Sequence, residues 1–131
     1  MVLRIGVLFL FVLLGVALFL TALCGRRYAR TRDERYRDSH RVCAIGAFIL
    51  MVAAIVSVKV VKMAQGSIGH GAVLTTHLLF AIPFFLLFVF AFFLFTGIRA
   101  PRYHHALVYP CLVLFAAAFI IGAAMLLGIA S

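Results

Sequence analysis

Four long stretches without Lys, Arg, Asp or Glu constrain the fold of this chain more than any other feature. Residues 5–24, 71–98 and 106–131 each supply the roughly 20 apolar residues that a helix needs to cross a bilayer. Residues 42–58 are fewer, and they reach that length if Lys59 extends its ammonium group to the membrane surface. The sequence therefore predicts an all-α integral membrane protein, a four-helix bundle.

The composition agrees with a lipid environment. Hydrophobic residues make up 67% of the 131 residues and charged residues 11%, and the mean hydropathy is +1.26. Soluble domains are about 45–50% apolar and about 25% charged, so a water-soluble fold of this size could not bury so much apolar surface. We expect one transmembrane domain over residues 1–131, with helices at about 3–24, 40–64, 71–99 and 104–130.

The positions of Lys and Arg predict the orientation in the membrane. Residues 25–41 contain seven arginines and two more flank Pro101, against Arg4, Lys59 and Lys62 on the other side. Because basic loops stay in the cytoplasm, the N-terminus and the C-terminus are expected outside. The formal net charge of +9 then reflects topology and attraction to anionic lipid, so the expected partner is the lipid bilayer and not nucleic acid.

The polar residues of the predicted loops and spans give little support to an enzyme. The three acidic residues, Asp33, Glu34 and Asp38, all lie in the first loop, so the spans contain no carboxylate for a proton relay. The sequence also has no nucleophile–base motif, phosphate-binding loop or dinucleotide fingerprint. A non-enzyme is therefore favoured. In the same loop, Ser39 is the predicted N-cap of the second helix.

The cysteines and small residues have simple interpretations. Cys24, Cys43 and Cys111 are odd in number and widely spaced, which argues against a disulfide framework or a zinc cluster, and we interpret them as small apolar packing residues. In the last span, two pairs of small residues at a spacing of four favour close helix packing within the bundle, with self-association as a homo-oligomer as the alternative. The pairs are Ala118 with Gly122 and Ala124 with Gly128.

Histidines are the main candidates for function, and His77 is the deepest of the five. It lies six residues past Gly71, or roughly 9 Å inside the outer end of its helix. An ionisable group at such a depth indicates a functional site, here a metal site for an ion such as copper. His70 lies seven residues earlier on the same face, at the mouth of that site. The alternative is a neutral His77 hydrogen-bonded to a backbone carbonyl or a threonine of a neighbouring helix.

A second group of histidines lies at the predicted cytoplasmic boundary. His40 opens the second helix, and His104 and His105 open the fourth, which runs in the same direction. Imidazoles from two helices of a bundle can be the paired axial ligands of a haem. His40 with either His104 or His105 therefore predicts a haem b site. The alternative is a set of interfacial histidines beside Arg41 in the headgroup layer.

This layout resembles a known family. His40 and Arg41 open the second helix, one histidine lies in the outer part of the third, and residues 102–105 open the fourth. The pattern is similar to that of a family of small four-helix bacterial membrane proteins of uncharacterised function, which includes a maturation factor for haem-copper terminal oxidases in Gram-positive bacteria. The resemblance implies a bacterial cytoplasmic (inner) membrane location, a haem-copper oxidase as partner and this functional set: His40, Arg41, His77 and one of His104 or His105.

The sequence is compatible with three functions. The favoured function is that of a small polytopic membrane protein that handles haem or copper, or assists assembly of a respiratory terminal oxidase. The first alternative is a non-catalytic packing subunit of a larger membrane complex, whose histidines bind nothing. The second is a small b-type cytochrome that transfers electrons itself.

Overall fold

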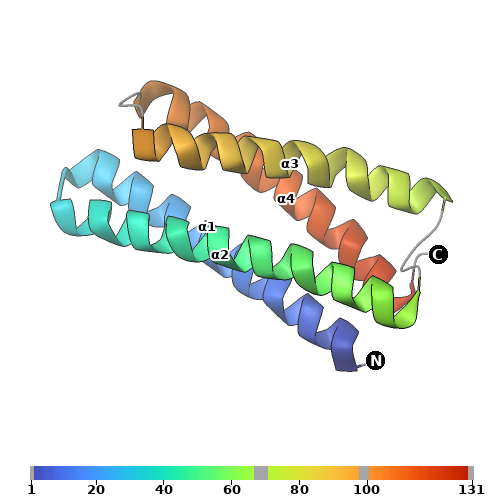
Figure 1. Cartoon of the computed structure of the whole chain (residues 1–131). Coiled ribbons are helices and arrows are strands. Elements are labelled where there is room, and N and C mark those ends of the chain that lie inside the picture. Colours follow the sequence, from blue (N-terminus) through green and yellow to red (C-terminus); the bar gives the residue numbers. More distant parts are fainter. Residues whose placement is uncertain (1, 67–70, 98–100, 130–131) are drawn as a thin grey trace. The chain divides into compact units, whose positions relative to one another are not determined.

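The residues that the structure describes form four helices. In this computed structural model, α1 spans Val2–Thr31, α2 spans Glu34–Gln65, α3 spans Gly71–Gly97 and α4 spans Pro101–Leu127 (Figure 1). The structure describes residues 2–66, 71–97 and 101–129, without the side chains of residues 65, 94–97 and 101–105, and no strand occurs in these ranges. Each helix contains a segment long and apolar enough to cross a membrane. The predicted all-α, multi-pass membrane protein is thus confirmed, and its orientation stays a prediction.

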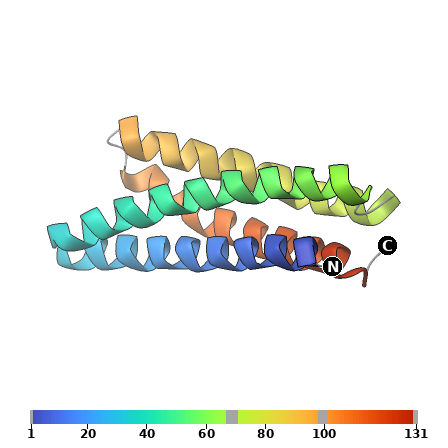
Figure 2. The same ribbon diagram turned by 60° about the horizontal axis from the view of Figure 1, so that its bottom comes forward.

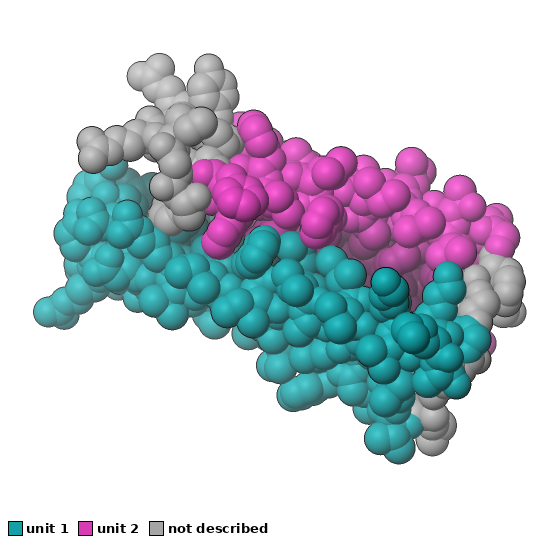
Figure 3. Space-filling model, viewed as in Figure 1, with its two compact units in different colours: residues 1–66 teal, residues 67–131 magenta. Residues whose placement is uncertain are grey.

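The helices pack as two hairpins, each a compact unit. The first hairpin, Met1–Gly66, contains α1 and α2, and the second hairpin, Ser67–Ser131, contains α3 and α4 (Figure 3). Within each hairpin the two helices run antiparallel and contact each other, as both ribbon views show (Figures 1 and 2). Each hairpin therefore has its own set of helix–helix contacts.

Both helices of the first hairpin extend beyond their predicted ends. The predicted loop was 25–41, but α1 continues to Thr31 and α2 begins at Glu34. Arginine is a good helix former, and cations near the end of α1 interact favourably with the partial negative charge there. The arginines thus mark where the chain leaves the apolar layer of the membrane. The helix continues beyond that point because its backbone groups form hydrogen bonds with each other in lipid and in water.

The connection between α1 and α2 contains only Arg32 and Asp33. Arg32 has a φ of 57°, the left-handed conformation that ends a helix, and its N–H donates to the Tyr28 carbonyl at 2.8 Å. The Asp33 carboxylate caps α2 by accepting from the N–H of Arg35 at 2.9 Å. Ser39, the predicted cap, lies inside α2 instead.

The second hairpin keeps its helices intact through two prolines. Pro83 lies inside α3 and Pro110 inside α4, and both helices continue through them, as expected for kinks rather than breaks. Past the end of α4, Gly128 has a φ of 74° and its N–H donates to the Met125 carbonyl at 3.2 Å. No atom lies within 4 Å of a Cβ built on Gly128. Gly128 therefore ends the helix, and no described residue of the chain packs against it.

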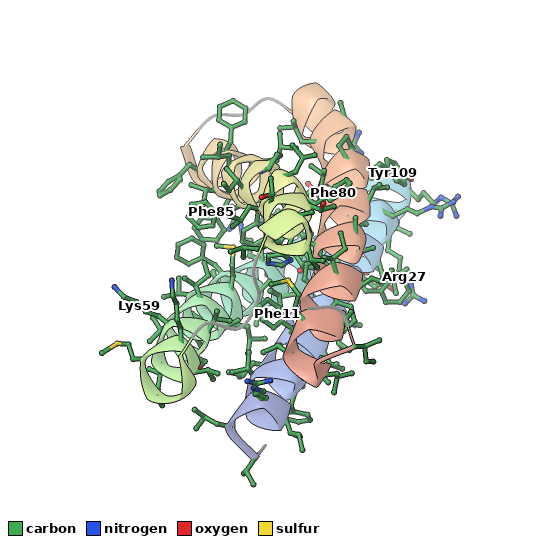
Figure 4. All side chains as sticks on the ribbon, turned by 90° about the vertical axis from the view of Figure 1, so that its right-hand side faces the viewer. Phe11, Arg27, Lys59, Phe80, Phe85 and Tyr109 are labelled. Atoms are coloured by element: carbon green, nitrogen blue, oxygen red, sulfur yellow. The ribbon has the colours of Figure 1, made fainter. Side chains whose placement is uncertain are left out.

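Large apolar side chains cover the outside of all four helices. Phe9, Ile49, Leu86 and Ile120 are between 60% and 66% exposed. Exposed surface of this kind is compatible with contact with the bilayer. Figure 4 shows the side chain of Arg27 directed away from its helix, where the positive charge can reach the headgroup layer.

Candidate functional site

His40 joins the two helices of the first hairpin. Its side chain is only 6% exposed, and its Nδ1 lies 2.7 Å from the Thr21 carbonyl oxygen of α1. A carbonyl oxygen only accepts hydrogen bonds, so Nδ1 carries the proton and donates. The bond also satisfies a polar group whose burial without a partner would be unfavourable.

Gly25 makes room for this imidazole. A Cβ at Gly25 would lie 3.1 Å from both Cε1 and Nδ1 of His40. Such contacts are tighter than ordinary van der Waals contacts, so a larger residue at this position would push the ring away. Gly25 follows Thr21 by four residues, one helical turn, so a single face of α1 supplies both the hydrogen-bond acceptor and the space.

His77 makes the corresponding contact in the second hairpin. Its Nδ1 lies 3.0 Å from the Ala118 carbonyl oxygen of α4, and a Cβ at Gly122 would lie 2.9 Å from its Cε1. The alternative considered for His77, a hydrogen bond to a backbone carbonyl of another helix, is thus the arrangement observed. The small residues Ala118 and Gly122, predicted to permit close packing, lie at this contact within the second hairpin.

The two hairpins therefore share one arrangement, which we call the histidine–glycine contact. A histidine Nδ1–H donates to a main-chain carbonyl of the neighbouring helix, and the imidazole ring packs on the glycine that follows this carbonyl by four residues. Each histidine is the seventh residue of its helix, counted from Glu34 in α2 and from Gly71 in α3. The sequence shows no internal repeat that would indicate this similarity. The residues involved are His40 with Thr21 and Gly25, and His77 with Ala118 and Gly122.

Two cysteines face each other beside the contact of the first hairpin. The side chains of Cys24 on α1 and Cys43 on α2 lie close enough to interact with each other, and both residues are half-buried. Cys24 directly precedes Gly25, and Cys43 lies three residues after His40. The sequence interpretation treated these cysteines as separate packing residues, so it missed the pair.

Charged and aromatic side chains gather near the turn of the first hairpin. The Arg27 guanidinium of α1 lies 5.6 Å from the centroid of the Tyr36 ring of α2. This cation–π contact connects the two helices. Arg37 forms an ion pair with Glu34 in the first turn of α2. Exposed ion pairs contribute little to stability, at most about 1 kcal/mol. These groups mainly give the turn a positive electrostatic potential, because arginines outnumber carboxylates there.

The remaining predicted site residues are only partly covered by the structure. His70 lies outside the described residues, as do the side chains of His104 and His105 at the start of α4. The predicted haem ligation by His40 with either of the last two therefore stays a prediction. Arg41 follows His40 on α2 and is exposed. Among the described residues, no group of three or more His, Cys, Asp or Glu could hold a metal ion.

No known protein family, curated protein or solved structure matches this chain. The similarity in histidine layout to the oxidase-maturation family stays an expectation from a few residues.

Proposed function

We propose that this multi-pass membrane protein handles copper or haem and assists assembly of a respiratory terminal oxidase in the bacterial cytoplasmic membrane. One observation carries the proposal: His40 and His77 both donate through Nδ1 to a main-chain carbonyl of the neighbouring helix. Histidines that bind metals are commonly held in this way, because a hydrogen bond from one ring nitrogen fixes the orientation of the imidazole.

Stability alone gives a weak reason for these histidines. A buried hydrogen bond contributes a net of about 0.5–1.5 kcal/mol, and burying an apolar side chain of similar size contributes at least as much. An ionisable residue within a membrane span raises the free energy of the folded protein. Its presence there therefore indicates a function that needs it. The same arrangement in both hairpins supports a role that needs the imidazole itself.

Copper and haem iron both accept imidazole nitrogen as a ligand, and they divide the candidate residues between them. The haem hypothesis uses His40 with His104 or His105 and adds Arg41 from the family resemblance. The copper hypothesis uses His77, with His70 at the mouth of the site.

The experiment compares the parent protein with His40→Ala, His77→Ala and a matched control, Thr76→Ala. Thr76 precedes His77 on α3, but its hydroxyl bonds the Ala72 carbonyl of its own helix at 2.8 Å. We expect both histidine variants to lower terminal oxidase activity in cells that lack the native gene, and to lower the copper or haem content of the purified protein. The control should match the parent. Unchanged activity and unchanged metal content in both histidine variants would contradict the proposal.

A packing subunit is the second candidate, and the tight fit of the His77 ring on Gly122 favours it. In that case the histidines serve only to hold each hairpin together. The purified protein would then be colourless and free of metal, and His77→Ala would lower its thermal stability without changing oxidase activity. A Soret band with peaks that shift on reduction would instead identify a small b-type cytochrome.

A further inference from the structure

We infer that Cys24 and Cys43 form a binding site for one Cu(I) ion in the first hairpin. The two thiols come from facing helices and lie close enough to interact with each other. Both are half-buried, so a bound ion would be partly shielded from solvent and would still have a route of entry. The choice of copper as cargo rests on the proposed function, and the inference adds the oxidation state and the ligands.

The histidine–glycine contact holds the thiol pair in place. The bond from His40 Nδ1 to the Thr21 carbonyl, at 2.7 Å, and the close approach of Gly25 to the ring bring α1 and α2 together at this level. Cys24 is the residue before Gly25, and Cys43 shares a face of α2 with His40 because they are three residues apart. Both sulfur atoms are therefore carried by packed helices, which position ligands more accurately than loops do.

The number and type of donors select the ion. Thiolates are soft ligands that bind Cu(I), zinc or iron–sulfur clusters. A structural zinc site needs four ligands, and the part of the chain that the structure describes contains no group of three donors that could hold a metal. Cu(II) prefers nitrogen and oxygen donors in a tetragonal arrangement. Cu(I) is a d¹⁰ ion that two thiolates satisfy in a linear arrangement, so the pair fits Cu(I).

The binding reaction balances without an oxidant or a reductant. One Cu(I) ion displaces the protons of both thiols, two sulfur–copper bonds form, two protons pass to solvent, and copper stays in the same oxidation state. The product carries one net negative charge. Residues 25–41 contain seven arginines and three carboxylates, a surplus of four positive charges that begins two residues after Cys24. This positive potential favours the anionic complex.

The test uses the purified full-length chain in detergent micelles with a reductant present. Cu(I) is titrated against the chromogenic chelator bicinchoninate, which competes for the ion. We expect one Cu(I) per parent chain and loss of that stoichiometric binding in Cys24→Ser and in Cys43→Ser. Cys111→Ser is the matched control, because Cys111 is buried in α4 of the second hairpin, and it should bind like the parent. Full binding in the double variant Cys24→Ser/Cys43→Ser, or no binding by the parent, would overturn the inference.

A second measurement needs no variant and so does not depend on variants that fold. Ag(I), which has the same preference for paired thiolates and does not change oxidation state, is added to the parent before a maleimide reagent. One equivalent should protect Cys24 and Cys43 from modification, as mapped by peptide mass spectrometry, and unprotected thiols would overturn the site. The proposed function can fail separately from this site. If Cu(I) binds at the thiols but oxidase activity is unchanged in His40→Ala and His77→Ala, the proposed function is contradicted and the Cu(I) site is supported. If oxidase activity falls in His77→Ala but no Cu(I) binds at the thiols, the Cu(I) site is contradicted and the proposed function is supported.

Discussion

In the first hairpin, the imidazole of the histidine–glycine contact lies one turn from two facing thiols, close to a turn rich in arginine. In the second hairpin, aromatic rings lie near the equivalent contact. The ring centroids of Phe84 and Phe115 are 5.2 Å apart, and those of Phe115 and Phe119 are 6.0 Å apart. Aromatic pairs add about 0.5–1.5 kcal/mol each beyond the apolar area that they bury. The same contact thus joins both helix pairs, and the residues beside it are two thiols in the first hairpin and aromatic rings in the second.

Filling the glycine positions should produce the largest effects and would test whether the contact is equally important in both hairpins. Gly122→Leu places a side chain where even a Cβ meets His77 at 2.9 Å, and Gly25→Leu does so against His40 at 3.1 Å. We expect each to lower the free energy of unfolding by about 2–4 kcal/mol, from overpacking together with a lost buried hydrogen bond. Gly122→Leu should have the larger effect, because its contact is closer.

The measurement is unfolding in detergent micelles, followed by circular dichroism. Gly46→Leu is the control, because no atom lies within 4 Å of a Cβ built at that position of α2. If all three leucine variants are equally stable, the glycines do not set the approach of the helices, and the comparison between the hairpins fails.

A double-mutant cycle in the second hairpin gives a smaller and more specific effect. Gly122→Ala should destabilise the parent, because the added methyl group meets the imidazole of His77. In a His77→Ala background that methyl group has no ring to meet, so the same change should be nearly neutral. The expected coupling energy is about 1–2 kcal/mol, within the range for residues in contact. Additive effects would show that His77 and Gly122 do not contact each other.

The spans could be predicted from the sequence, whereas the helix ends could not. Crossing a membrane requires a run of apolar residues whatever their order, so composition alone located the four spans. The end of a helix depends on local capping, and the sequence analysis selected Ser39, whereas Asp33 caps α2 in the structure. The arginine-rich segment 25–41 was therefore interpreted as a loop, where the structure has a two-residue connection.

That error also hid the thiol pair. Once the chain turns at Asp33, residues at similar distances before and after it face each other: Cys24 lies nine residues before and Cys43 ten residues after. A long predicted loop removes this register, so the two cysteines appeared unrelated. The contact of His77 with Ala118 spans 41 residues and has no comparable register signal. Its only sequence signal was Gly122, which follows Ala118 at the spacing that brings two helices close.

The cap of α2 tests how much the first hairpin depends on its turn. Asp33→Ala removes the carboxylate that accepts from the Arg35 N–H, so we expect a loss of about 1 kcal/mol in the free energy of unfolding. Asp33→Asn keeps a capping oxygen and should cost much less. Cu(I) binding should persist in both variants, because the His40 contact lies closer to the thiols than the turn does. Loss of binding in Asp33→Ala alone would show that the turn sets the register of the thiols.

The smallest effect concerns the left-handed residue of the same turn. Arg32 has a φ of 57°, which is unfavourable for a side chain with a Cβ but not for glycine. Arg32→Gly removes that strain and raises the entropy of the unfolded chain, so we expect a net gain of about 0.5 kcal/mol. Arg30→Gly is the matched control: it removes the same charge from a helical position of α1 and should cost about 0.5–1 kcal/mol. Opposite signs in the two variants would show that backbone conformation sets the stability of this turn. A loss of stability in both variants would show that the left-handed conformation of Arg32 does not limit the stability of the turn.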